Sequence, residues 1–237
     1  MTHAHEAYQD AYEDEVGRDR ALRIDGVLNA RDLGGLSGPR GRVRSGLVLR
    51  AACLSGLTEQ GAQTLTALGV RTIIDLRTPL ERLEEPNRLA GNEDLGVREL
   101  HVELLETLWG LPETSMELYQ HLVDRCGTGI VEVLEYLTQP DSTPALVHCM
   151  VGKDRTGLTV ALLLDLLGVP RETIVADYVA SNAGLGTEVR TLVRADVLEQ
   201  TLAGLDEKYG SPLAYLTAHG LTPDAIDALR SVLLVDR

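Results

Sequence analysis

Hydrophobic and polar positions fall into blocks along the chain that predict strands followed by helices. The apolar runs at 70–76 and 144–147 have the length of buried strands. Helical patterns occupy 58–68 and 158–164, and the first of them opens at Thr58, a typical N-cap residue. Strands that alternate with helices in this way predict an α/β fold with a central, mostly parallel sheet of about four or five strands flanked by helices.

Turn residues and further helical patterns account for the rest of the chain. Short apolar stretches between 24 and 41 end in Asn, Asp and paired Gly, and residues 43–49 would supply a hairpin partner. Residues 116–137 predict a long helical region with a break near two glycines. A helix is predicted again at 171–179, and residues 187–205 have the apolar spacing of an amphipathic helix.

Composition predicts one globular domain with a polar tail. Residues 1–20 are rich in Asp and Glu, so we expect a flexible acidic tail there and a single domain over 21–237. The hydrophobic fraction is 44%, but no apolar run approaches the roughly 18 residues of a membrane span. The sequence as given also opens on polar residues, so we expect neither a transmembrane segment nor a signal peptide. A cytoplasmic location follows as an expectation, with export by another route left open.

Charge and cysteine content limit the partners that we expect. The formal net charge of −14 argues against nucleic acid and anionic membranes as partners, and against stable membrane insertion. Cys53, Cys126 and Cys149 are odd in number and have no ligand-like spacing, which predicts neither a metal site nor a disulfide framework. A redox role for Cys53 or Cys126 as a partner of Cys149 stays open.

The candidate chemistry lies at 148–157, between a predicted strand and a predicted helix. A tight loop before a helix points backbone N–H groups into one concavity and adds the positive end of the helix dipole, so an anion should bind there. Cys149 opens the loop and Arg155 closes it. A thiolate would therefore face a permanent cation across the bound anion, and the guanidinium could donate two hydrogen bonds to one phosphoryl group.

The sequence resembles the cysteine-dependent phosphatases at this loop. It has their Cys-x5-Arg signature, with His148 before the Cys, Gly152 third after it, and Thr156 with a glycine after the Arg. Residues 29–35 (Asn-Ala-Arg-Asp-Leu-Gly-Gly) resemble a second signature, that of the atypical bacterial tyrosine and phosphoinositide phosphatases. The resemblance extends over 24–234. It implies the cysteine-phosphatase fold, with a helical lid or insertion at about 183–208, although apolar spacing alone fits a packed core helix equally well.

The resemblance implies a metal-independent phosphomonoester hydrolase that needs no cofactor. Cys149 would form a phosphocysteine, Arg155 and the loop residues would bind the phosphate, and Asp154 inside the loop would be the general acid. Lys153 and Arg155 oppose the protonation that this role requires, so Asp75 and Asp32 are substitute acids. The resemblance also implies which other residues belong to the site. The expected phosphate-binding residues are Met150, Val151, Gly152, Lys153, Asp154 and Arg155, and the expected supporting residues are His148, Thr156, Asp75, Arg31 and Asp32.

Two questions about these residues stay open in the sequence. Asp75 ends the strand at 70–76, where an α/β sheet presents groups to a crevice. It could act near the phosphate, or form an ion pair with Arg77 or Arg31 that only orders a loop. The substrate is the second question. Phosphotyrosine in proteins is the first expectation, and phosphate is the expected product.

Alternative functions differ in substrate or in class. The extra positive charge of Lys153 would suit phosphoinositides, and a dual-specificity enzyme acting on Ser, Thr and Tyr is a further alternative. Outside the phosphatases, a rhodanese-like sulfurtransferase also places Cys at the start of a short loop before a helix. That activity gives no reason for Arg155 and Thr156 in this arrangement.

Overall fold

A five-stranded sheet lies at the centre of the fold, in a computed structural model that describes residues 20–89, 96–105, 112, 114–185 and 192–235. The strand order is β1-β4-β7-β5-β6, with β4, β7, β5 and β6 parallel and β1 antiparallel to β4. The predicted central, mostly parallel sheet is therefore confirmed. Its strands are β1 (Arg31–Asp32), β4 (Val48–Ala51), β5 (Thr72–Asp75), β6 (Arg98–His101) and β7 (Ala145–His148).

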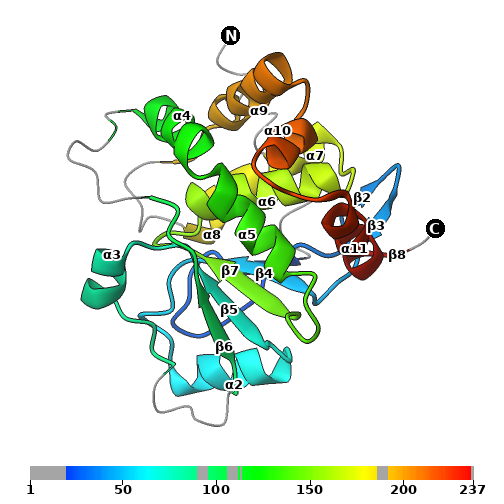
Figure 1. The fold of residues 1–237 in the computed structure, drawn as a ribbon. Coiled ribbons are helices and arrows are strands. Elements are labelled where there is room, and N and C mark those ends of the chain that lie inside the picture. The colour runs from blue at the N-terminus through cyan, green and yellow to red at the C-terminus, as the bar shows by residue number, and fades with distance from the viewer. Residues whose placement is uncertain (1–19, 90–95, 106–111, 113, 186–191, 236–237) are drawn as a thin grey trace.

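Helices cover both faces of this sheet (Figure 1). Helix α2 (Glu59–Ala67) lies on one face, and Thr58 caps it as predicted by accepting a hydrogen bond from the Gly61 N–H. The hydrophobic core has two parts, one on each face of the sheet. Ile73 of β5 packs on the α2 side and the next residue, Ile74, packs on the other, as the alternation of side chains along a strand requires. The larger face is covered mainly by α5 (Gly127–Tyr136), α6 (Arg155–Leu166), α7 (Arg171–Val179), α10 (Pro212–Ala218) and α11 (Pro223–Leu233).

A second, three-stranded antiparallel sheet joins the two ends of the domain. It contains β2 (Ser37–Gly38), β3 (Gly41–Val43) and β8 (Leu234–Val235) in that order. The sequence predicted a hairpin partner over 43–49 after the 38–41 turn. The structure divides that stretch between two sheets: Val43 ends β3, which pairs with β2 across the turn, whereas Val48 and Leu49 belong to β4, which pairs with β1 and β7. All four residues of β4 are buried, as expected for a strand inside the larger sheet.

The helical regions differ from the prediction mainly at their ends. The long region at 116–137 is two helices, α4 (Ser115–Arg125) and α5, and the break falls at Cys126. Helix α9 (Ala195–Tyr209) begins eight residues later than the predicted 187–205 helix, so Leu192 lies before it and is exposed. Short helices α3 (Pro79–Glu84) and α8 (Ser181–Leu185) complete the described elements. Of these described helices, none combines the length and apolarity that crossing a membrane requires.

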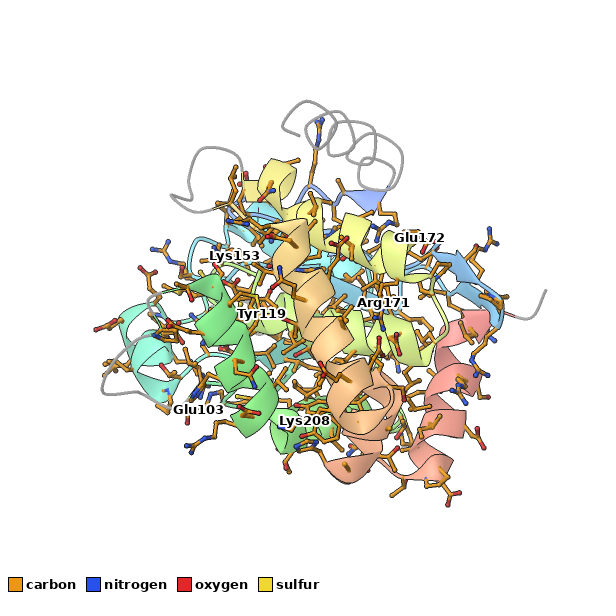
Figure 2. The ribbon with its side chains drawn as sticks, turned by 90° about the horizontal axis from the view of Figure 1, so that it is seen from above. Glu103, Tyr119, Lys153, Arg171, Glu172 and Lys208 are labelled. Atoms are coloured by element: carbon orange, nitrogen blue, oxygen red, sulfur yellow. The ribbon has the colours of Figure 1, made fainter. Side chains whose placement is uncertain are left out.

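Helix α9 packs on the body of the domain. Figure 2 shows it alongside α4, and an ion pair of 3.2 Å joins Lys208 on α9 to Asp124 on α4. Its apolar stripe, which includes Leu198 and Leu202, is buried. A lid movement of 183–208 stays a prediction, and residues 186–191 lie outside the described residues. The predicted flexible tail covers 1–20, of which 1–19 also lie outside the described residues.

Candidate active site

The Cys149 loop, residues 149–154, joins the end of β7 to the beginning of α6. This is the strand, loop and helix that the sequence predicted. Gly152 makes the tight turn in it: its φ is +72°, and a Cβ there would lie 2.2 Å from the carbonyl oxygen of Ala51. Glycine alone combines that backbone conformation with that close approach. The loop can therefore fold tightly against the end of β4.

Cys149 lies at the start of the loop with only 3% of its surface exposed. The backbone N–H of Gly152 donates a hydrogen bond of 3.3 Å to its Sγ. Helix α6 begins at the other end of the loop, so the positive end of its dipole faces the same region. Backbone N–H groups and a helix N-terminus thus place partial positive charge around the sulfur, as a thiolate nucleophile requires.

Arg155, at the first turn of α6, is held by a carboxylate from another element. Its Nη1 donates to Oε2 of Glu81 at 2.6 Å, and its Nη2 donates to Oε1 at 2.7 Å. Burial opposes the charge of both groups, but the paired hydrogen bonds raise the pKa of Arg155 and lower that of Glu81. The guanidinium is therefore charged and fixed in orientation beside the loop.

Glu81 is a site residue that the sequence did not single out. It is the third residue of α3, and its side chain accepts from the Thr78 backbone N–H at 2.8 Å while Thr78 caps the helix in return. One carboxylate therefore closes a capping box and holds Arg155. The Thr78-x-x-Glu81 pattern was a visible signal for the capping box, but the partner 74 residues away could not be deduced from it.

Asp154, the predicted general acid, lies in a half-buried environment inside the loop. Burial raises the pKa of its carboxyl, and the positive charges of Lys153 and Arg155 only partly offset that effect. Lys153 Nζ lies 3.8 Å from Asp154 Oδ2. The sequence predicted that Lys153 and Arg155 would oppose protonation of Asp154, and the effect of burial on its pKa is larger than theirs.

His148 precedes the loop in the sequence, and Thr156 follows Arg155. Both are fully buried. Among the described residues the hydroxyl Oγ1 of Thr156 makes no hydrogen bond, so it is available to a group bound at the loop. His148 Nδ1 lies 3.1 Å from the carbonyl oxygen of Cys149, and burial lowers its pKa to about 4. His148 is therefore neutral near pH 7.

Asp75 belongs to a buried network beneath the loop. Its carboxylate accepts from Arg77 Nε at 2.9 Å and Nη2 at 2.8 Å, and from Asn87 Nδ2 at 3.3 Å. His148 Nε2 lies 3.8 Å away. Burial works against ionisation, but the hydrogen bonds from Arg77 lower the pKa of Asp75, which makes it a poor proton donor. Of the two ion pairs considered, Asp75 forms the one with Arg77.

Arg31 and Asp32 lie in separate interactions. Arg31 is buried against Asp177 of α7, with Nε to Oδ1 at 3.1 Å, rather than against Asp75. The carboxylate of Asp32 accepts from the backbone N–H groups of Gly34, at 2.9 Å, and Gly46, at 2.7 Å. It orders the turns around β1 and β4. These contacts give Asp32 a structural role in the turns.

Comparison with known proteins identifies the chain. The family model described as the tyrosine phosphatase family matches residues 22–235, which is most of the sequence. The chain belongs to this family. It is accordingly an enzyme, a phosphatase, and the match contains the whole Cys149 loop, Arg155 and Glu81. Among its described residues, His, Cys, Asp and Glu side chains form no group of three that could hold a metal ion.

Relatives of this phosphatase have the same activity in their names. A tyrosine-protein phosphatase of Nostoc commune is 28% identical over 212 residues, which cover 77% of this chain and 72% of the relative. The triple specificity protein phosphatase PtpB of Mycobacterium tuberculosis is 28% identical over 275 residues, covering 89% and 98%.

Solved structures resemble the phosphatase more distantly. The Siw14 catalytic core has a TM-score of 0.45 and 16% identity, covering 86% of this chain and 96% of that one. TpbA of P. aeruginosa has a TM-score of 0.41 and 18% identity, covering 81% and 89%. These scores are low, and the family assignment rests on the family model that matches residues 22–235.

Proposed function

We propose that this phosphatase hydrolyses phosphomonoesters through a phosphocysteine on Cys149. One observation carries the proposal: a buried Cys149 and Arg155 lie at the two ends of one tight loop, and the guanidinium of Arg155 is fixed by two hydrogen bonds that it donates to Glu81. A nucleophilic sulfur, backbone N–H groups and a fixed cation are the groups that a transferring phosphoryl needs. No metal ion takes part in this scheme.

The reaction proceeds in two displacement steps. In the first, Cys149 Sγ forms a bond to phosphorus, the ester P–O bond breaks, and Asp154 gives its proton to the leaving oxygen. In the second, a water oxygen bonds to phosphorus and the S–P bond breaks, while Asp154 takes a proton from that water. The products are the dephosphorylated alcohol or phenol and inorganic phosphate. Arg155 and the N–H groups of residues 150–155 bind the non-bridging oxygens in both steps.

Phosphotyrosine in proteins is the substrate class that we propose. The names of the relatives support it, since they are called tyrosine-protein phosphatase and triple specificity protein phosphatase. Lys153, 13% exposed at its side chain, supports phosphoinositides or phosphoserine and phosphothreonine as a second candidate class, because it adds a cation near the bound phosphate. The described cysteines are free thiols, which agrees with the cytoplasmic location that we propose.

Hydrolysis of para-nitrophenyl phosphate in EDTA tests the mechanism. We expect turnover by the wild type, none above background in Cys149→Ser, and wild-type rates in Cys126→Ser. Cys126 is a matched control, because it is a buried cysteine outside the loop whose Sγ bonds the Leu104 carbonyl oxygen, and serine can keep that bond. Full activity in Cys149→Ser, or none in well-folded wild type, would contradict the proposal. Sulfur transfer from thiosulfate would then be assayed.

Phosphate release from matched substrates tests the substrate class. A phosphotyrosine peptide, the same peptide with phosphoserine, and a short-chain phosphoinositide are compared by kcat/KM. We expect the phosphotyrosine peptide to be preferred. A preference for the phosphoinositide that falls in Lys153→Gln, with para-nitrophenyl phosphate hydrolysis retained, would assign the enzyme to the second class.

A further inference from the structure

The outward-facing carbonyl groups of the Cys149 loop are held by two side chains from distant parts of the sequence. Asn29 Nδ2 donates to the carbonyl oxygens of Val151, at 3.2 Å, and Gly152, at 3.1 Å. Arg50 Nη2 donates to the same Gly152 oxygen at 2.8 Å. Both side chains are buried, and Arg50 is only 1% exposed. Side-chain hydrogen bonds therefore hold the carbonyl groups of two consecutive peptides in the loop.

Fastening these carbonyls fixes the direction of the N–H groups that line the loop. In a trans peptide the C=O and the following N–H point in opposite directions. When the Val151 oxygen is held outward, the Gly152 N–H must point inward, and it does reach Cys149 Sγ at 3.3 Å. The same geometry at the Gly152 oxygen directs the Lys153 N–H toward the side where an anion would bind.

Asp177 of α7 anchors both fastening side chains. Its Oδ2 accepts from Arg50 Nη1 at 2.7 Å, and its Oδ1 accepts from Arg31 Nε at 3.1 Å. Arg31 in turn donates from Nη1 to Asn29 Oδ1 at 2.6 Å. That bond orients the Asn29 amide so that its NH₂ group faces the loop. We call these four residues the Asp177 clamp: Asn29, Arg31, Arg50 and Asp177.

A third guanidinium contacts Asp177 from outside the clamp. Arg20 adds a further hydrogen bond to Asp177 Oδ1, at 2.7 Å, so among the described residues three guanidinium groups contact this carboxylate. Burial, together with the neighbouring charge of Arg50, lowers the pKa of Arg31 to about 10, so it stays charged at neutral pH. The ion pair of Arg31 with Asp177 is therefore intact at neutral pH.

We infer that Asn29 and Arg50 are positioning residues of this phosphatase, which through the Asp177 clamp hold the loop N–H groups in the phosphate-binding direction. The inference rests on the proposed function of the loop. It predicts that loss of either donor weakens oxyanion binding itself, beyond any effect on stability. Preorganised N–H donors are effective because they need no reorientation when the charge arrives.

Two variants remove the donors in different ways. In Arg50→Lys the charge remains, but one ammonium cannot bridge Asp177 and the Gly152 oxygen as the guanidinium does. In Asn29→Gly the amide is lost without backbone strain, because Asn29 has φ +57°, which glycine adopts freely. Arg20→Gln is the matched control: it removes a cation from Asp177, and the hydrogen bonds of Arg20 to Asp177 and to the Asp32 carbonyl oxygen do not involve the loop.

Calorimetric titration with inorganic phosphate gives the deciding measurement, alongside thermal unfolding and the kcat and KM for para-nitrophenyl phosphate. We expect the dissociation constant for phosphate to rise about tenfold or more in Arg50→Lys and Asn29→Gly, with kcat/KM falling at least as far. Arg20→Gln is expected to lower the melting temperature while the phosphate constant stays within about twofold of wild type.

An unchanged dissociation constant for phosphate in both variants, with normal binding by the wild type, would overturn the inference and leave the proposed function standing. An equal loss of phosphate binding in Arg20→Gln would also overturn it, because any disturbance of Asp177 would then have the same effect. Failure of the wild type to bind phosphate would overturn the proposed function as well.

If Arg50→Lys does not fold, Asn29→Gly alone decides, since it leaves every arginine in place.

Discussion

Arg155 and Glu81 form a two-point hydrogen-bonded pair, with N–O distances of 2.6 and 2.7 Å, between the first turn of α6 and the first turn of α3. Each helix follows a strand of the central sheet, α6 after β7 and α3 after β5. These strands are parallel neighbours, so the elements that follow them start at the same edge of the sheet. The sheet therefore brings Glu81 next to Arg155, and Glu81 fixes the orientation of this predicted phosphate-binding cation.

Glu81→Gln should lower kcat/KM for para-nitrophenyl phosphate by about tenfold to a hundredfold, because hydrogen bonds to charged groups contribute about 1.5–3 kcal/mol and Arg155 would lose its fixed orientation. Glu84→Gln is the control, since Glu84 lies on the same helix with its side chain exposed. Steady-state kinetics of both variants check this. Equal rates for Glu81→Gln and wild type would show that Arg155 orients itself without Glu81.

Asp154→Asn should remove the high-pH limb of the pH–rate profile. A general acid works only when protonated, and the pKa of Asp154 is raised by burial, so activity should persist above its ordinary range and fall as pH passes the raised value. The loss of kcat in the variant should shrink with a more acidic leaving phenol. Asp165→Asn is the control, a carboxyl on α6 whose pKa burial also raises. A wild-type profile in Asp154→Asn would point to another acid.

Thr156→Val should slow the second step of the reaction. The buried Thr156 hydroxyl has no hydrogen bond among the described residues, so its removal should cost little stability while taking a hydrogen bond from the departing sulfur. Rapid-quench kinetics should show a larger burst of phenol and a smaller steady-state rate. Thr159→Val tests specificity, because Thr159 is buried on the same helix and bonds the Arg155 carbonyl oxygen. An unchanged burst would place Thr156 outside the chemistry.

Asp177→Asn should destabilise the fold by about 3–5 kcal/mol at pH 7, since it leaves buried guanidinium groups without their counter-charge. Burial opposes ionisation, but the arginines hold the pKa of Asp177 far below its ordinary value. Its stabilising contribution is therefore complete above the unfolded pKa of about 3.9 and declines as pH falls below that.

Urea unfolding at several pH values measures the effect of Asp177→Asn. Asp206→Asn is the comparison, because the ion pair of Asp206 with Arg171 is exposed and should contribute at most about 1 kcal/mol. A loss at Asp177 no larger than that at Asp206 would contradict the assignment of Asp177 as a buried anchor.

The fold class and the Cys149 loop could be predicted from the sequence because their signals are local. A buried strand, a glycine at the turn and a helix in succession determine where backbone N–H groups converge. Boundaries were less predictable. Leu192 has helical spacing with later residues, yet α9 begins at Ala195, because burial of the apolar stripe against α4 and α7 decides which turns form.

By itself, the sequence determined the order of strands and helices, the loop with Cys149 and Arg155 at its ends, and the likeness of residues 29–35 to a family signature. Only the tertiary structure decided what those last residues do. It placed Asn29 behind the loop, paired Arg31 with Asp177, and brought Glu81 to Arg155. Such pairs join residues that are 74 to 146 positions apart in the sequence. These ion pairs and hydrogen bonds form only because the sheet brings the ends of its strands together.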